Sequence, residues 1–207
     1  MDNIDQYMID GRLLYWEELY RDTPSNKLPW YTTKLDDDFR KALNDLPIRP
    51  TKILDVGAGP GSQSFALANE GFSVTATDIS QTAIDIARKV ASEKLLDIRF
   101  VLDDITNSNL LGKFDLIIDR GCFHVLPIDM RLGYINATHN LLNNGGRLFI
   151  KSRSHEEKMV QGPYGFDINE LHSLFSPPFS VHDIRKTTFN SCMYSELKSI
   201  YGEFIRK

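Results

Sequence analysis

Three glycines, Gly57, Gly59 and Gly61, lie almost side by side in the chain, directly after an apolar run and before a helix-like segment. A glycine has no side chain, so a loop of this kind lets the atoms of a ligand lie against the backbone. Asp78 closes the next strand-like run. A carboxylate at that place can accept hydrogen bonds from both hydroxyls of a ribose. Together these residues predict a ligand that carries a nucleoside.

Two nucleoside ligands suit this arrangement, a nicotinamide dinucleotide and S-adenosylmethionine. The dinucleotide fingerprint is Gly-x-Gly-x-x-Gly. Here Ser62 stands in place of the third glycine, and Pro60 removes one backbone donor from the loop. Asp55 adds a negative charge, which disfavours pyrophosphate and favours a ligand with ammonium and sulfonium groups. The pattern favours S-adenosylmethionine. A nicotinamide-dependent oxidoreductase and a nucleoside-binding module without chemistry stay open as alternatives.

These residues need a scaffold, and the periodicity of the chain indicates which one. Short β-rich runs alternate with helix-like stretches from residue 51 to residue 154, which is typical of right-handed crossovers and a parallel sheet covered on both faces. A helix is predicted at 167–175. The strand-like runs 179–189 and 196–206 are then joined by a link too short for a crossover, so they should be antiparallel. We expect an α/β fold with a doubly wound, mostly parallel, seven-stranded sheet and an antiparallel C-terminal strand.

The size and composition of the chain fit one domain. With 207 residues, of which 42% are hydrophobic, the chain can bury a large core. We divide the single domain 1–207 into three parts: an N-terminal helical cap at 1–50, with helices at about 12–21 and 36–46; a cofactor-binding α/β core at 51–154; and a substrate loop, helix and strand pair at 155–207.

Charge and cysteine content limit the partners. The net charge is −4, and lysines and arginines form no patch of the kind that nucleic acid binding requires, so no nucleic acid is expected. The apolar runs are too short to span a bilayer, so no membrane is expected either. Only two cysteines and an acidic N-terminus without signal-peptide pattern favour the cytoplasm. We expect a small-molecule substrate; the sequence does not indicate an oligomeric state.

Other acidic, histidine and cysteine side chains are better explained by structural roles than by metal binding or catalysis. The run Asp36 to Asp38 could suggest a metal site, but acids in the first turn of a helix cap its free N–H groups and complement its dipole. Four of the histidines are scattered without ligand spacing, and we predict no metal. Cys122 is interpreted as a small buried side chain rather than a nucleophile.

Several stretches resemble a known family. The segment "ILDVGAGPGSQSFALANEGFSVTATDIS" resembles the first two motifs of class I S-adenosylmethionine-dependent methyltransferases, "FVLDDI" their third-strand acidic motif, and "FDLIIDRGCFHVLP" their fourth-strand motif. The chain is most similar to the thiopurine S-methyltransferase-like group and the tellurite-resistance methyltransferases beside it. The residues that carry this finer similarity are "YWEELY", "LPW", Asp119-Arg120-Gly121 and Gly162-Pro163.

The resemblance implies S-adenosylmethionine as cofactor, S-adenosylhomocysteine as its product, and a Rossmann-like methyltransferase fold. It implies that Asp104 holds the adenine amino group with Ile105 beside the ring; the alternative for Asp104 is a plain helix cap. It also implies aromatic cover from the N-terminal helix, where Tyr20 could instead belong to the core. The expected cofactor-binding residues are Trp16, Trp30, Asp55, Gly57, Gly59, Gly61, Asp78, Ile79, Asp104, Ile105 and Arg120.

Methyl transfer from a sulfonium is an in-line displacement that depends mainly on positioning. A thiol or chalcogen acceptor needs little help with deprotonation, whereas a hydroxyl or amine usually needs a base. His124 follows the predicted fourth strand and is the histidine placed to act as that base, if it is not simply structural. Arg120 would reach the cofactor or an anionic substrate group. We take a small thiol or chalcogen compound as the expected acceptor, with a hydroxyl, an amine, a protein lysine or RNA as alternatives.

Overall fold

The computed structural model describes residues 12–157, 164–192 and 196–207. Its centre is a seven-stranded sheet in the order β3-β2-β1-β4-β5-β7-β6. The first five strands are parallel, and β7 is antiparallel to both of its neighbours. The expected fold class is therefore confirmed. The strands are β1 (Lys52–Val56), β2 (Ser73–Asp78), β3 (Ile98–Leu102), β4 (Phe114–Arg120), β5 (Leu142–Arg153), β6 (Phe179–Phe189) and β7 (Leu197–Arg206).

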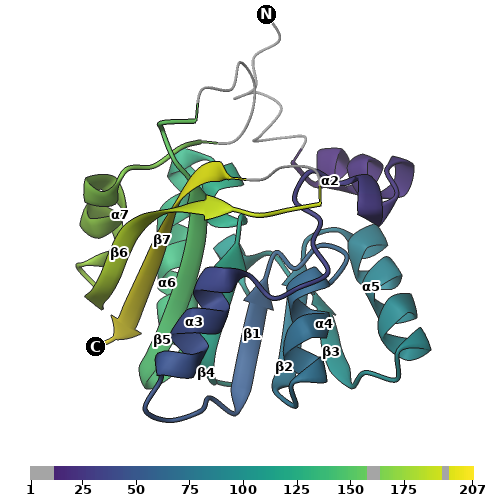
Figure 1. The fold of residues 1–207 in the computed structure, drawn as a ribbon, viewed down its shortest axis with the longest axis horizontal. Helices are drawn as coiled ribbons and strands as arrows, with labels where there is room; N and C mark the ends of the chain where they lie inside the picture. Colours follow the sequence, from purple (N-terminus) through teal and green to yellow (C-terminus); the bar gives the residue numbers. More distant parts are fainter. Residues whose placement is uncertain (1–11, 158–163, 193–195) are drawn as a thin grey trace, which may run out of the picture.

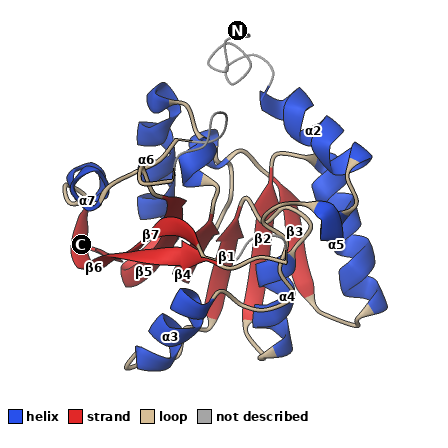
Figure 2. Cartoon of the chain, turned by 45° about the horizontal axis from the view of Figure 1, so that its top comes forward, coloured by secondary structure: helices blue, strands red, loops and turns tan. Residues whose placement is uncertain are grey.

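Helices cover both faces of the sheet. On one face lie α3 (Asp37–Asp45), α4 (Ser62–Asn69) and α5 (Gln81–Glu93), and on the other lie α6 (Arg131–Leu141) and α7 (Ile168–Phe175) (Figures 1 and 2). A further helix, α2 (Arg12–Asp22), packs against α5 at the edge where the parallel strands end (Figure 1). Among the described residues, no helix combines the length and the apolar character that crossing a bilayer requires.

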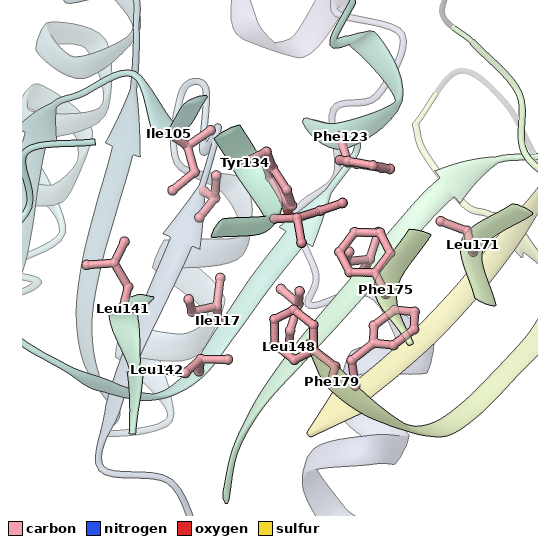
Figure 3. Packing of buried hydrophobic residues seen from close by; sticks show 14 of the residues in the cluster. Ile105, Ile117, Phe123, Tyr134, Leu141, Leu142, Leu148, Leu171, Phe175 and Phe179 are labelled. Atoms are coloured by element: carbon pink, nitrogen blue, oxygen red, sulfur yellow. The ribbon is translucent and has the colours of Figure 1, made fainter. Parts of the chain in front are cut away.

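The alternation of residues along each strand explains the two layers of the core. In β4, Leu116 and Ile118 are fully buried under α3 and α4, whereas Ile117 belongs to the cluster on the opposite face. That second cluster includes Phe123, Tyr134, Phe175 and Phe179 from the segments around α6 and α7 (Figure 3). Because both faces of the central strands are buried, their side chains read as nearly continuous apolar runs.

One helix boundary differs from the sequence prediction. The pattern from 128 to 144 predicts one long helix, but α6 ends at Leu141 and β5 begins at Leu142. The reason is the glycine pair that follows, in which Gly145 has a φ of +74° and Gly146 lies against the backbone of Asn143. The chain therefore turns into the sheet early, and a register shift between Phe114 and Leu116 accommodates the extra residues.

The topology defines where a ligand is expected. The strand order reverses at β1, because the chain moves from β1 to β2 and β3 on one side and then to β4 and β5 on the other. In open α/β sheets, the crevice at such a reversal, outside the carboxyl ends of the strands, is the usual place of a ligand. We call this edge the carboxyl edge. It lies on the side of the sheet where α2 is found (Figure 1).

Candidate functional site

The glycine loop lies at the carboxyl edge directly after β1. Gly57, Gly59 and Gly61 have φ values of +62°, +54° and +90°, which side-chain-bearing residues rarely adopt. Space is short as well: a Cβ on Gly57 would lie 2.7 Å from the Cβ of Cys122, and one on Gly59 would lie 2.9 Å from the Tyr20 hydroxyl. Both the backbone conformation and the packing therefore require glycine here.

Asp78 connects the glycine loop to the end of β2. Its Oδ2 accepts a hydrogen bond from the N–H of Gly59 at 2.9 Å, and its Oδ1 accepts one from the N–H of Ser80 at 2.9 Å. Burial raises the pKa of Asp78 to about 6, although these backbone N–H groups favour the charged form. Ile79 follows directly and is partly exposed. The carboxylate is thus held in one orientation between β1 and β2.

Two more buried carboxylates lie at this edge, Asp55 in β1 and Asp119 in β4. Burial raises the pKa of Asp55 to about 7, despite a hydrogen bond of 2.5 Å from the Ser64 hydroxyl, and the nearby Asp119 and Asp78 act in the same direction as burial. Burial likewise raises the pKa of Asp119 to about 6. In the described part of the chain, no lysine or arginine forms an ion pair with any of the three aspartates. The site therefore favours a positively charged ligand.

Asp104 and Ile105 follow β3 and begin the short 3-10 helix η2 (Ile105–Asn107). Asp104 caps this helix, since its Oδ1 accepts hydrogen bonds from the N–H and the hydroxyl of Thr106 at 2.9 and 2.8 Å. Ile105 is 4% exposed and belongs to the core cluster on the α6 face (Figure 3). The helix-cap interpretation of Asp104 matches the structure, and its role toward an adenine stays a prediction.

Aromatic side chains from the N-terminal segment gather above the glycine loop. Trp16 and Tyr20 of α2 stack with ring centroids 5.8 Å apart, and Trp30 meets their edges at 5.9 and 6.4 Å. Tyr20 is buried with its hydroxyl over Gly59, whereas Trp16 and Trp30 keep partial exposure. The structure thus brings together Trp16, Trp30 and the glycine loop, and it shows that Tyr20 both packs in a small core and contacts the loop.

Arg120, at the end of β4, is oriented by protein groups on all three of its nitrogens. Nε lies 2.9 Å from Asp36 Oδ2, Nη1 donates to the carbonyl of Trp30 at 2.9 Å, and Nη2 donates to the carbonyl of Asn190 at 2.6 Å. Its side chain is only 6% exposed. A direct contact to cofactor or substrate stays a prediction. The observed contacts make Arg120 a link between β4, the segment before α3 and the end of β6.

His124 lies in the 3-10 helix η3 (Phe123–Val125) beyond β4. Its Nδ1 accepts a hydrogen bond from the N–H of Arg153 at 3.2 Å, which places the ring proton on Nε2. Burial, together with the charges of Arg153 and Arg120, lowers the pKa of His124 to about 3. The imidazole is therefore neutral at physiological pH, with one nitrogen already engaged. These properties suit a hydrogen-bond donor better than a general base.

The sequence interpretation missed Lys151. This lysine directly follows the apolar run Leu148 to Ile150 of β5 and is 2% exposed, with its Nζ 2.8 Å from Asp36 Oδ1 and 2.7 Å from Asp38 Oδ2. Asp36 does cap α3 by accepting the N–H of Asp38, as the helix-cap interpretation predicts, but it also forms buried ion pairs with Lys151 and Arg120. The signal was available, because a lysine within a predicted central strand must find a partner in the interior.

Two further sequence expectations concern the Gly162-Pro163 pair and the absence of a metal site. The Gly162-Pro163 pair lies outside the described residues. His155, Asp167 and Glu170 bring ligand-type atoms within 4.8 Å of one another on the surface, although the sequence suggested no metal site. The two acids already form a capping box at the start of α7, in which each accepts the N–H of the other at 2.8 Å. Helix capping accounts for this group.

Residues 53–146 match the model of a protein family described as a methyltransferase domain. The ubiquinone biosynthesis O-methyltransferase of Pseudomonas aeruginosa is 30% identical over 139 residues, which are 65% of this chain and 57% of that protein. The chain spans 57 to 60% of the length of the first curated relatives that it matches.

Solved structures share the fold. A structure described as "Conversion of a Disulfide Bond into a Thioacetal Group during Echinomycin Biosynthesis" aligns with a TM-score of 0.82 at 21% identity, over 95% of this chain and 93% of that one. The structure of TehB from Haemophilus influenzae aligns with a TM-score of 0.70 at 19% identity, over 93% of this chain and 67% of that one.

Proposed function

We propose that the chain, whose residues 53–146 match the model of a methyltransferase domain, is an S-adenosylmethionine-dependent methyltransferase that acts on a small molecule. One observation carries the proposal: three buried carboxylates, Asp55, Asp78 and Asp119, surround a glycine loop at the carboxyl edge without a described basic partner. S-adenosylmethionine is a nucleoside with an ammonium and a sulfonium group, so its charges complement this site. A nicotinamide dinucleotide would bring the negative charges of its pyrophosphate.

The residues of the chain can divide the work of binding. We assign the ribose hydroxyls to Asp78, whose fixed orientation supports this role, and the cofactor atoms nearest the loop to the bare backbone from Gly57 to Gly61, where a side chain would be in the way. Asp104 and Ile105 lie at the end of the neighbouring strand, on the side proposed for the adenine. When bound, S-adenosylmethionine supplies an electrophilic methyl group that an in-line nucleophile can take.

The aromatic side chains above the loop exclude water. Trp16, Tyr20 and Trp30 present apolar surface to the same edge, and their ring faces attract a cationic group. A displacement reaction needs no covalent intermediate on the protein. Holding the reactants in line in a site without water therefore accounts for much of the expected rate enhancement.

For the acceptor atom, we propose sulfur or another chalcogen. The neutral His124, with Nδ1 engaged, offers no base for a weakly acidic hydroxyl or amine, whereas a thiol ionises readily without one. The similarity to a structure connected with disulfide and thioacetal chemistry, and the similarity to TehB, are compatible with this choice and with the thiopurine- and tellurite-methyltransferase-like group. An oxygen acceptor is the second candidate, because a curated relative is an O-methyltransferase.

Titration calorimetry tests the cofactor. We expect heat signals with S-adenosylmethionine and S-adenosylhomocysteine and none with NADH or NADPH; the reverse result would favour an oxidoreductase. A panel of matched thiol and phenol acceptors then tests the acceptor atom, with methylated products identified by mass spectrometry. Faster transfer to phenols than to thiols of similar pKa would move the proposal to oxygen.

A further inference from the structure

Five charged side chains form a group that we call the Lys151 cluster, buried except for the partly exposed Arg185: Asp36, Asp38, Arg120, Lys151 and Arg185. Lys151 is at its centre and bonds to both aspartates. Asp36 Oδ2 also pairs with Nε of Arg120 at 2.9 Å, and Asp38 Oδ1 pairs with Nη2 of Arg185 at 2.9 Å. The side chains of Lys151 and Asp36 are each 2% exposed, so these charges have almost no access to water.

The cluster joins parts of the chain that are distant in sequence. Asp36 and Asp38 come from the start of α3, Arg120 from the end of β4, Lys151 from β5 and Arg185 from β6. From the cluster, the guanidinium of Arg120 reaches the carbonyls of Trp30 and Asn190. The cluster therefore connects the sheet to the segment that carries Trp30 and to the end of the β6 strand.

A further hydrogen bond joins the same two segments directly. The N–H of Cys192, beyond the end of β6, donates to the carbonyl of Tyr31, next to Trp30, at 2.9 Å. The ring of Phe189, just before Asn190, lies near two cations of the cluster, 5.2 Å from Arg120 and 5.4 Å from Lys151, and its centroid is 6.0 Å from that of His124. Trp30 and Phe189 thus contact the cluster directly, and His124 contacts it through Phe189.

The orientation of Arg120 depends on Lys151 through Asp36. One carboxylate oxygen of Asp36 bonds to Lys151 and the other to Arg120, so the ammonium fixes the plane of the carboxylate that orients the guanidinium. A buried ion pair contributes little net stability compared with an apolar replacement, so its value lies in the geometry that it imposes. The geometry imposed here is the position of Trp30 over the carboxyl edge.

We propose that Lys151 is a positioning residue of the methyl-transfer site, which through Asp36 and Arg120 holds Trp30 and the end of β6 over the carboxyl edge. The proposal rests on the proposed function for its role in the reaction. Its structural part can be tested without cofactor or acceptor.

The chain contains two tryptophans, so a Trp16→Phe background leaves Trp30 as the single fluorescent reporter. We expect Lys151→Met to increase the quenching of Trp30 by acrylamide, and Lys151→Arg to restore most of the protection. The double variant Lys151→Met with Asp38→Asn removes one positive and one negative charge, so the net charge of the cluster is unchanged. If the single variant does not fold, the acrylamide quenching of Trp30 is measured in this double variant instead.

Leu67→Ala is the control, because Leu67 is a fully buried residue of α4 in the core under the sheet, and its loss lowers the melting temperature without touching the cluster. Compared at an equal distance below their melting temperatures, Leu67→Ala should leave Trp30 quenching at the wild-type value. Equal quenching in Lys151→Met, Leu67→Ala and wild type would overturn the proposal.

With the acceptor found in the panel, and without the Trp16→Phe change, Lys151→Met should lower kcat by about tenfold or more, with recovery in Lys151→Arg. Increased quenching with an unchanged kcat would contradict the role in the reaction. If the wild type binds no S-adenosylmethionine, the proposed function fails, and the quenching result still decides whether Lys151 positions Trp30.

Discussion

The three strand-end aspartates differ in the bonding capacity that they have left for a ligand. A carboxylate offers about four lone-pair positions. Asp119 fills all of them, since it accepts the N–H groups of Gly121, Cys122 and Phe123 and the hydroxyl of Tyr134. Asp78 accepts one N–H on each oxygen from Gly59 and Ser80 and a further backbone N–H from Ile79, which leaves it more room than Asp119. Asp78 is therefore better suited than Asp119 to bind ribose hydroxyls.

We expect Asp78→Asn to weaken S-adenosylmethionine binding by about tenfold or more, because it replaces a charge-assisted acceptor with a neutral amide. Titration calorimetry at pH 8 measures the affinity, and circular dichroism checks the fold. Asp115→Asn is the matched control, since Asp115 also accepts backbone N–H groups, from Thr51 and Lys52, but at the opposite end of β4. Wild-type affinity in Asp78→Asn would remove Asp78 from the ribose site.

His124 should not control the pH dependence of the reaction. With its pKa at about 3, it keeps one charge state above pH 5, so kcat/KM should show no inflection near pH 6.5 that belongs to this residue. His124→Gln keeps an N–H donor and should lose less than about tenfold in kcat, well below the effect of removing a general base. An inflection near pH 6.5 that disappears in His124→Gln would identify a base after all.

At the scale of elements, Asp119 fixes the turn that leads from β4 into η3. Asp119→Ala leaves three backbone N–H groups and the Tyr134 hydroxyl without their acceptor in the interior, so unfolding free energy should fall by about 3 kcal/mol or more. Asp115→Ala also loses hydrogen bonds, but at a partly exposed place where water can replace the carboxylate, and it should cost less. Urea unfolding of both variants measures the difference, and equal losses would argue against this role of the turn.

At the scale of the whole molecule, the buried aspartates make stability depend on pH. Their pKa values in the folded protein, about 6 to 7, lie above the usual aspartate value of 3.8, so the folded state binds more protons than the unfolded state as these groups titrate. Stability from these groups is therefore greatest at low pH and is lost as pH rises through 6 to 7. His124 acts in the opposite sense below about pH 6.5, because only its unfolded form takes up a proton.

We therefore expect the unfolding free energy of the ligand-free protein to fall between pH 6 and pH 8, and Asp55→Asn to remove the larger part of this fall, because Asp55 has the highest pKa of the three. A cationic ligand favours the charged carboxylates, so S-adenosylmethionine should raise the melting temperature more at pH 8 than at pH 6. Urea unfolding and thermal scans at the two pH values measure both effects. A flat profile in the wild type would show that the carboxylates are already charged at pH 6.

The order of the elements was predictable from the sequence, because it depends on local patterns. The alternation of strand-like and helix-like runs predicted the parallel sheet, and the short link between 189 and 196 predicted an antiparallel pair; both are confirmed. The glycines of the loop and Asp78 were also identifiable, since each belongs to a pattern of neighbouring residues. The end of α6 at Leu141 was not predicted, because the helix-like pattern of apolar residues continues beyond Leu142, where the chain already pairs with β4 as a strand.

Only the tertiary structure decided which charges meet. Asp36 and Lys151 are 115 positions apart, and Asp38 and Thr187 are 149 apart, yet each pair forms a hydrogen bond of 2.8 Å or less. No periodicity within either segment encodes such a contact, which follows from the strand order and from the way α3 packs across the sheet. Asp36 also orients Arg120, which donates to the carbonyl of Trp30, and burial in the folded chain leaves His124 neutral. The chemistry of these side chains is set by their environment, and that environment exists only in the folded chain.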